Sequence, residues 1–175
     1  MKIRVETIDS TGSKFAQPLA TSWLVETMGP NCIFTPIADG SLAVNLTRVE
    51  DVVQAQGEIK LSLRTDCSRC LERLVQDFKF PIALTFFPDG ELPAGDEDGQ
   101  LGADQMNCLT YVDSEIDLGE IVHDEVVLEL PTKPLCRTSC AGLCPQCGVN
   151  LNLQPCDCPE PVDPRWAGLK GLKVN

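Results

Sequence analysis

The sequence predicts an α+β protein with an antiparallel β meander or small barrel-like sheet, one main helix, and a cysteine-rich zinc module near the C-terminus. Three observations lead to this prediction. Apolar residues alternate with polar ones between residues 41 and 87, an apolar stripe follows between residues 117 and 130, and ten cysteines occur in 175 residues. Alternation is typical of half-buried strands, and a stripe at helical spacing is typical of an amphipathic helix.

The strands are predicted from segments in which every second side chain is apolar. In "SLAVNLTRVE", which begins at residue 41, positions 42, 44 and 46 are apolar, and in "GEIKLSLRTD" positions 59, 61 and 63 repeat the pattern. In "LVQDFKFPIALTFFP", Phe78 and Phe80 alternate with Asp77 and Lys79. These segments predict a meander with one face packed on the core and the other exposed to solvent. A further strand is expected at the start of residues 1–8, whereas residues 21–28 fit either a strand or a short helix.

The main helix is predicted over "DLGEIVHDEVVLELP". Asp117 can cap its N-terminus, and Glu120 follows three residues later, as in a capping box. The helix should end near Leu130, because Pro131 disfavours helical geometry in the residue before it. The apolar stripe comprises Leu118, Ile121, Val122 and Val126.

The division of the chain follows from its composition. Residues 88–107 contain six acidic and no basic residues together with glycines and prolines, which predicts a mobile acidic loop. A short strand is expected at 109–112. We therefore expect an α+β domain over residues 1–135, a zinc-binding module over 136–160 and a C-terminal tail over 161–175.

The formal charge of −12 excludes a general nucleic-acid surface. The chain has 14 basic and 26 acidic residues, and affinity for a nucleic acid comes largely from lysine and arginine displacing counterions. Any RNA contact should therefore be local, or should pass through a basic partner protein. No apolar run approaches the roughly 20 residues of a membrane span, and no targeting segment is recognisable. We expect a cytoplasmic protein without membrane contact.

Eight of the ten cysteines fall into four close pairs. A disulfide framework is not expected, because cytosolic thiols stay reduced. A structural zinc site takes four thiolates, and two cysteines separated by two residues can hold an ion from one tight turn. In "CPQCG", Pro145 fixes φ after the first ligand and Gly148 lets the backbone fold under the metal. The predicted zinc ligands are Cys67, Cys70, Cys136, Cys140, Cys144, Cys147, Cys156 and Cys158.

The four pairs are predicted to form two tetrathiolate sites, with one competing division. The two C-terminal pairs are close in sequence, so joining them costs little loop entropy, and the first two pairs would then form a second site. Alternatively the two middle pairs share one ion, and the outer pairs bind weakly or not at all. The sequence does not decide between one and two zinc ions. Iron is also possible, because a tetrahedron of thiolates suits both metals, but it is the less favoured of the two.

Catalytic motifs are not evident in the sequence. The single histidine, His123, lies next to Asp124 on the predicted helix and should face solvent. No phosphate-binding glycine loop, GxSxG or HExxH occurs. A thioredoxin-type CxxC stands at a helix N-terminus, whereas Cys67 follows a predicted strand and Cys144 lies in a loop. We expect no enzyme and no small-molecule substrate, with a thiol redox or iron-binding protein as the alternative.

Several segments together resemble one family. They are "CSRCLERLVQDF", "DLGEIVHDEVVLELPTKPLC", "CAGLCPQCGVNLN" and "DPRWAGLKGLK". The chain resembles the YceD-like family, the large ribosomal RNA subunit accumulation proteins, over about residues 41–173. The resemblance implies a non-enzymatic ribosome biogenesis factor that supports accumulation of large-subunit (23S) ribosomal RNA. Its partners would be the large-subunit precursor, through basic ribosomal proteins or ribosomal RNA. A generic zinc-stabilised protein-interaction module is the other alternative.

The C-terminal tail contains a small basic cluster with one aromatic residue. Arginine and lysine side chains can contact phosphates and tryptophan can stack on a base, so the cluster is a candidate RNA-binding site. The alternative is that Trp166 and Leu169 pack on the domain. The candidate RNA-binding residues are Arg165, Trp166, Lys170 and Lys173.

Overall fold

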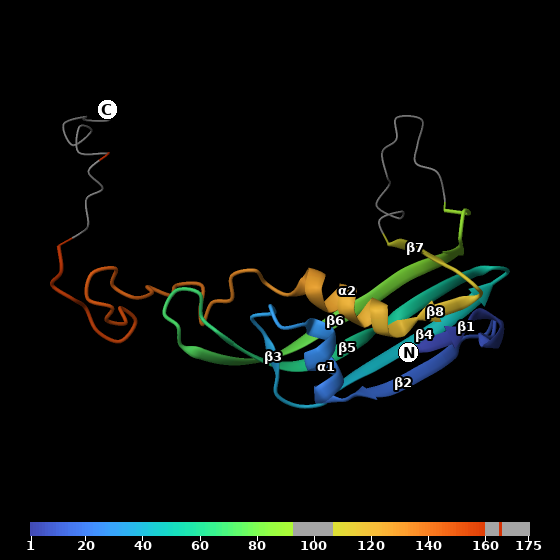
Figure 1. The fold of residues 1–175 in the computed structure, drawn as a ribbon, viewed down its shortest axis with the longest axis horizontal. Helices are drawn as coiled ribbons and strands as arrows, with labels where there is room; N and C mark the ends of the chain where they lie inside the picture. Colours follow the sequence, from blue (N-terminus) through green and yellow to red (C-terminus); the bar gives the residue numbers. More distant parts are fainter. Residues whose placement is uncertain (93–106, 160–164, 166–175) are drawn as a thin grey trace. The chain divides into compact units, whose positions relative to one another are not determined.

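The computed structural model describes residues 1–92, 107–159 and 165 of the chain (Figure 1). It divides into two compact units. The first comprises Met1–Thr65 and Val75–Thr132, and the second comprises Asp66–Leu74 and Lys133–Asn175. Most of the predicted acidic loop and almost all of the predicted tail lie outside the described residues. Among the described residues, no helix has both the length and the apolar character that crossing a membrane requires.

The first unit contains a six-stranded sheet with the order β2-β4-β5-β6-β7, in which β3 also pairs with β5. The strands are β2 (Ser13–Leu19), β3 (Thr35–Pro36), β4 (Gly40–Val49), β5 (Val52–Asp66), β6 (Arg73–Pro88) and β7 (Cys108–Tyr111). β4 is antiparallel to both of its neighbours, β2 and β5. The alternation in the sequence therefore predicted the central strands correctly.

The strand expected at residues 109–112, whose direction was not predicted, is β7, and it makes the sheet mixed. This strand pairs with β6 in parallel, with Leu109 opposite Phe86. A parallel pair needs a long crossover in place of a tight hairpin, and the acidic segment supplies that length. A separate two-stranded sheet is formed by β1 (Lys2–Arg4) and β8 (Glu115–Asp117), which are antiparallel.

The sheet is accompanied by two α-helices, so the prediction of one main helix is incomplete. The second, α2 (Leu118–Glu129), is the predicted one, and Gly119 N donates to the Asp117 side chain at its start. The first, α1 (Thr21–Met28), has no cap from its own flanking residues. Its start is instead held by Asp39, whose Oδ1 accepts from the backbone N and the hydroxyl of Thr21 at 2.8 and 2.7 Å.

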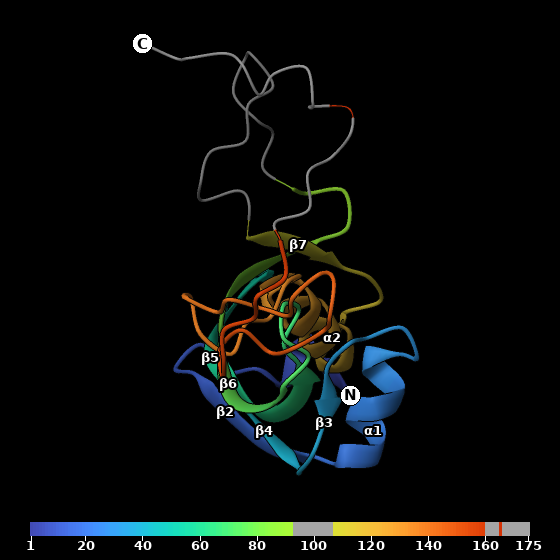
Figure 2. The same cartoon turned by 90° about the vertical axis from the view of Figure 1, so that its left-hand side faces the viewer.

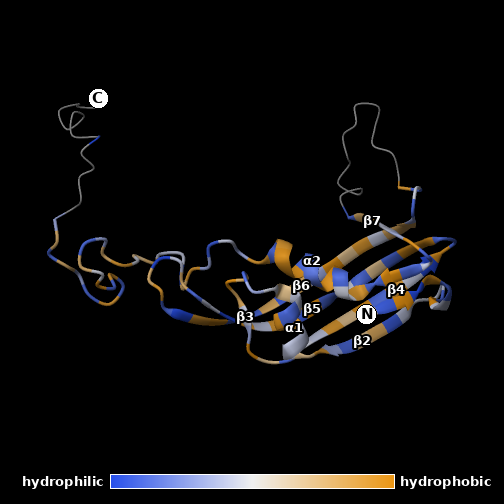
Figure 3. Cartoon of the chain, in the orientation of Figure 1, coloured by the Kyte–Doolittle hydropathy of each residue, from blue (hydrophilic) through white to orange (hydrophobic). Residues whose placement is uncertain are grey.

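The core of the first unit lies between the sheet and α2. Figure 2 shows the strands curving around this helix, and Figure 3 shows apolar and polar residues alternating along β4 and β5. The helix contributes its predicted apolar stripe, all four residues of which are buried. The strands contribute alternate residues, including Leu42, Val44, Leu46, Ile59, Leu61, Leu63, Phe80, Ile82 and Leu84.

A glycine allows two central strands to approach closely. Gly57 of β5 lies opposite Val44 of β4. A Cβ atom added to Gly57 would overlap the carbonyl oxygen of Ala43 and lie 2.7 Å from Cα of Val44. Glycine within a strand often marks such a backbone contact, and here no side chain can be accommodated without shifting β4.

Replacing Gly57 with alanine should therefore lower the free energy of unfolding by about 1–3 kcal/mol, as overpacking usually does. The added methyl group meets backbone atoms, which cannot move without disturbing the pairing of β4 with β5. Urea unfolding followed by circular dichroism measures the change. The exposed neighbour Gln56 provides the control, since Gln56→Ala should change stability by less than about 0.5 kcal/mol. Equal stability of Gly57→Ala and the unaltered protein would contradict the close approach.

Candidate metal centre

The second unit brings the eight paired cysteines into two groups of four. Within each group the four sulfurs all lie within 4.8 Å of one another. The alternative that joins the two middle pairs is not the arrangement that the structure adopts. The first group is Cys67, Cys70, Cys136 and Cys140, and the second is Cys144, Cys147, Cys156 and Cys158.

Each group begins with a tight turn that carries a CxxC pair. In the first turn, Leu71 N donates to the carbonyl of Cys67 at 2.9 Å, and Cys67 N donates to the carbonyl of Glu72 at 2.9 Å. In the second turn, Gly148 N donates to the carbonyl of Cys144 at 2.9 Å, and Cys144 N donates to that of Val149 at 2.8 Å. The two turns therefore have the same backbone hydrogen bonds at the same spacing.

The two turns differ at the residue that follows the second cysteine. Gly148 has φ +72°, a left-handed conformation that glycine adopts without steric cost. Leu71 holds the same position in the first turn with φ +59°. A side chain with a Cβ atom pays roughly 1–2 kcal/mol in this region. The first turn therefore stores strain that the second does not.

The spacing of the sulfurs fits a tetrahedral metal ion. Four sulfurs about 2.3 Å from a zinc ion would be about 3.8 Å apart. In the first group, the Sγ atoms of Cys67 and Cys140 are 3.8 Å apart, and those of Cys70 and Cys136 are 3.6 Å apart. The cysteines form no disulfides with one another. Both groups could therefore hold a metal ion through four thiolates.

Hydrogen bonds to sulfur favour the thiolate form of one cysteine in each turn. Burial opposes ionisation of Cys67, but backbone N–H groups of Cys70, Arg69 and Cys136 point at its sulfur and lower its pKa to about 6. The N–H groups of Cys147 and Gln146 likewise lower the pKa of Cys144 to about 6.

Other thiols resist ionisation. Burial and the neighbouring sulfurs raise the pKa of Cys136 to about 12. The side chain of Cys147, followed by burial, raises the pKa of Cys158 to about 12. Four adjacent thiolates repel one another, so a bound cation would be needed to hold all four deprotonated.

Three polar residues around the first group were missed by sequence reasoning. Asn152 Nδ2 donates to the sulfur of Cys140 at 3.3 Å, and its Oδ1 accepts from Arg137 Nη2 at 2.9 Å. Arg69 Nη1 donates to the carbonyl of Cys140 at 2.9 Å. The only sequence signal is that Arg69 lies between two predicted ligands and Arg137 follows one. Asn152 lies 12 residues beyond Cys140, and only folding brings the two together.

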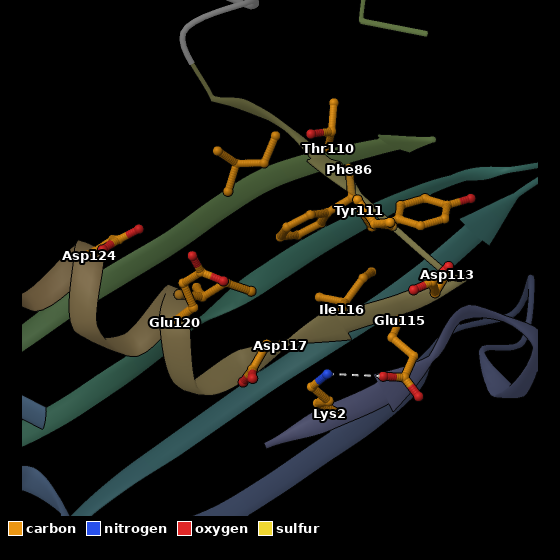
Figure 4. Close-up of a pocket in the computed structure, with 13 residues that line it drawn as sticks. Lys2, Phe86, Thr110, Tyr111, Asp113, Glu115, Ile116, Asp117, Glu120 and Asp124 are labelled. Atoms are coloured by element: carbon orange, nitrogen blue, oxygen red, sulfur yellow. Dashed lines mark ion pairs between the residues drawn. The ribbon is translucent and has the colours of Figure 1, made fainter. Parts of the chain in front are cut away.

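A cavity in the first unit is lined by other kinds of side chain. It has a volume of about 480 Å³ and lies between α2, β7 and β8. Figure 4 shows Glu120 and Asp124 on α2 beside this space, and an ion pair of 3.3 Å joins Lys2 to Glu115. Its lining contains neither cysteine nor histidine, so the thiolate chemistry belongs to the second unit.

The remaining predicted residues are placed as follows. His123 lies on α2, and its Nδ1 is 2.8 Å from the Asp124 carboxylate. Of the candidate RNA-binding residues, Arg165 is described and exposed. Trp166, Lys170 and Lys173 lie outside the described residues.

The comparison with known families covers the greater part of the chain. The family described as "Large ribosomal RNA subunit accumulation protein YceD" matches residues 55–173. The chain belongs to the YceD family. The match begins within β5 and contains both cysteine groups of this YceD protein.

Relatives in other organisms are longer than this YceD chain. An uncharacterized protein of Mycobacterium tuberculosis is 36% identical over 137 residues, which are 76% of this chain and 63% of that protein. An uncharacterized protein of Mycobacterium leprae is 29% identical over 133 residues, 75% of this chain and 58% of that protein. The Arabidopsis thaliana "Large ribosomal RNA subunit accumulation protein YCED homolog 1, chloroplastic" is 26% identical over 160 residues, 79% of this chain and 49% of that protein. No solved structure matches the chain.

The two turns of this YceD protein should respond oppositely to substitution at equivalent positions. Leu71→Gly should stabilise the second unit by about 0.5–1 kcal/mol, because it removes the left-handed strain and the Leu71 side chain is 66% exposed. Gly148→Ala should destabilise it by about 1 kcal/mol, because it introduces that strain. Unfolding of the metal-loaded protein in urea measures both. A loss of stability in Leu71→Gly would show that the leucine contributes more by packing than it costs in backbone strain.

Proposed function

We propose that this chain is a non-enzymatic ribosome biogenesis factor that supports accumulation of large-subunit (23S) ribosomal RNA, and that zinc staples its second unit. Membership in the YceD family is the observation that carries the proposal. The name of the chloroplastic relative also refers to large ribosomal RNA subunit accumulation. The proposal extends to the whole protein what the family description states.

The proposed metal is zinc at both cysteine groups. Four thiolates in a tetrahedron are the usual donor set of a structural zinc site. Zinc would supply the positive charge that holds the thiols deprotonated, and the surrounding residues would position the sulfurs. Backbone N–H groups and Asn152 orient the sulfurs, as the partners around structural metal sites commonly do.

The distribution of charge supports different partners for the two units. The second unit holds seven of the 14 basic residues and five of the 26 acidic ones, a net charge of +2. The first unit holds the other seven basic and 21 acidic residues, a net charge of −14. We propose that the first unit meets basic ribosomal proteins of the large-subunit precursor, and that any contact with ribosomal RNA is made by the second unit. Two zinc tetrathiolates would add about −2 each and bring the second unit from +2 to about −2, still far less acidic than the first unit. Any RNA contact would therefore depend on local arginine and lysine side chains.

Metal analysis tests the zinc staple. The purified protein should contain two zinc ions per chain by inductively coupled plasma mass spectrometry. Removing them with a strong chelator should unfold the second unit, because the buried residues of its small core are Cys67, Cys70 and Cys140. The helices and sheet of the first unit should remain in the circular dichroism spectrum, since they have an apolar core. One zinc ion per chain, or iron in its place, would contradict the two-zinc proposal.

A complementation experiment tests the cellular role. Depleting the protein in cells that encode it should lower the ratio of mature large-subunit to small-subunit ribosomal RNA. Expression of the unaltered protein should restore the ratio, but Cys140→Ser should not, because it removes a buried ligand. Cys32→Ser is the matched control, since Cys32 belongs to neither group. An unchanged ratio after depletion would overturn the role in ribosomal RNA accumulation.

A further inference from the structure

The two cysteine groups differ in how far they are covered. In the first group three cysteines are buried and Cys136 is half-buried. In the second group only Cys144 is buried, Cys156 and Cys158 are half-buried, and Cys147 is exposed. Cys147 is therefore the one exposed ligand among the eight, all of which are described residues. Small electrophiles and oxidants reach exposed thiolates first.

The groups also differ in the charge that surrounds them. Two arginines belong to the hydrogen-bond network of the first group, in which Arg69 contacts Cys140 and Arg137 contacts Asn152. These cations offset part of the negative charge of a tetrathiolate site, to which the Glu72 carboxylate, 4.0 Å from the Cys70 sulfur, adds. In the second group an acidic residue, Asp157, lies between two of the ligands, and backbone N–H groups supply hydrogen bonds to Cys144. The first group therefore has arginines in its hydrogen-bond network, whereas the residue between two ligands of the second group is acidic.

We propose that Cys147 is an oxidation-sensitive ligand, and that peroxide releases the metal of the second group while the first group retains its own. This inference rests on the proposed zinc occupancy. The two groups then have different roles. The first cysteine group holds the second unit folded. The second cysteine group attaches the segment that carries Cys156 and Cys158 to the turn that carries Cys144 and Cys147, and this attachment is lost on oxidation.

The chemistry requires a peroxide as oxidant and no other reactant. The Cys147 thiolate attacks one peroxide oxygen, so that an S–O bond forms, the O–O bond breaks and hydroxide leaves. The Cys158 thiolate, whose sulfur lies within 4.8 Å of the Cys147 sulfur, then attacks that sulfur. An S–S bond forms, the S–O bond breaks and a second hydroxide leaves. The sulfurs lose two electrons, the peroxide gains them, and protons convert the hydroxides to water.

Loss of the metal should have a local structural effect. Residues 153–159 contain no buried side chain, and Leu153 is 82% exposed. The backbone N–H groups of Leu153 and Gln154 donate to the carbonyl of Asn150 at 3.0 and 3.2 Å. Beyond these bonds, the described contacts between this segment and the second turn are those of the two cysteines and a hydrogen bond from Gln146 Nε2 to the carbonyl of Pro159. The described chain beyond Gln154 should therefore become detached from the turn, whereas the first group stays closed.

The test uses the full chain loaded with zinc and treated with hydrogen peroxide. A zinc-sensing dye should report release of one zinc ion per chain at a rate at least about tenfold above that of the second ion, as expected when one site is exposed and the other buried. Differential alkylation followed by mass spectrometry should find Cys147 linked to Cys158. The cysteines of the first group should still be alkylated as reduced thiols.

Two variants complete the design. Cys147→Ser should bind one zinc ion and lack the fast release phase, whereas Cys70→Ser, its equivalent in the first turn, should disrupt the unit. Equal release rates in the unaltered protein, or earlier oxidation of Cys67 or Cys70, would overturn this inference alone. Fewer than two bound zinc ions before treatment would overturn the zinc staple, and the inference with it. Mapping on the unaltered protein decides the question even if a variant does not fold.

Discussion

Four sulfur atoms from two segments 66 residues apart meet in the first cysteine group of the second unit. The buried residues of this small core are the cysteines Cys67, Cys70 and Cys140, and the apolar side chains packed against them are three half-buried leucines, Leu74, Leu135 and Leu143. In the first unit, burial of apolar surface supplies the stability. In the second, four sulfurs converge in each group, and a bound cation would hold them together as thiolates, which otherwise repel one another.

The surroundings of the thiolates follow from that constraint. Backbone N–H groups of the tight turns point at the sulfurs. At Cys140, Asn152 donates a hydrogen bond to the sulfur and Arg69 donates one to the backbone carbonyl. Leu143 N also donates to the carbonyl of Arg69 at 3.1 Å, so the segment that leads into the second turn is attached to the first. One turn therefore positions the next. A metal at the first group would stabilise both turns, whereas a metal at the second group would hold only the residues that follow.

Much of the first unit was predictable because its signals are local. Alternation identified β4 and β5, since each strand packs one face only, and the stripe and cap of α2 lie within 12 residues. The helix α1 could not be decided from residues 21–28, because Asp39, which caps it, is 18 residues away. The direction of β7 could not be predicted, because the length of its connection permits either orientation and only pairing with β6 selects one. The local strand pattern is the same in both cases.

The sequence by itself determined that eight cysteines occur in chelating pairs, that an amphipathic helix follows the strands, and that the chain is acidic, because these properties depend on residue type and short spacing. The spacing of the pairs also favoured the grouping that the structure has. Only the tertiary structure excluded the competing grouping and decided which residues donate to the sulfurs and that Cys147 is exposed while Cys67 is buried. It also revealed that the negative charge is concentrated in one unit. The physical reason is that contacts over 60 or more residues depend on the path of the backbone, and short spacings in the sequence do not encode that path.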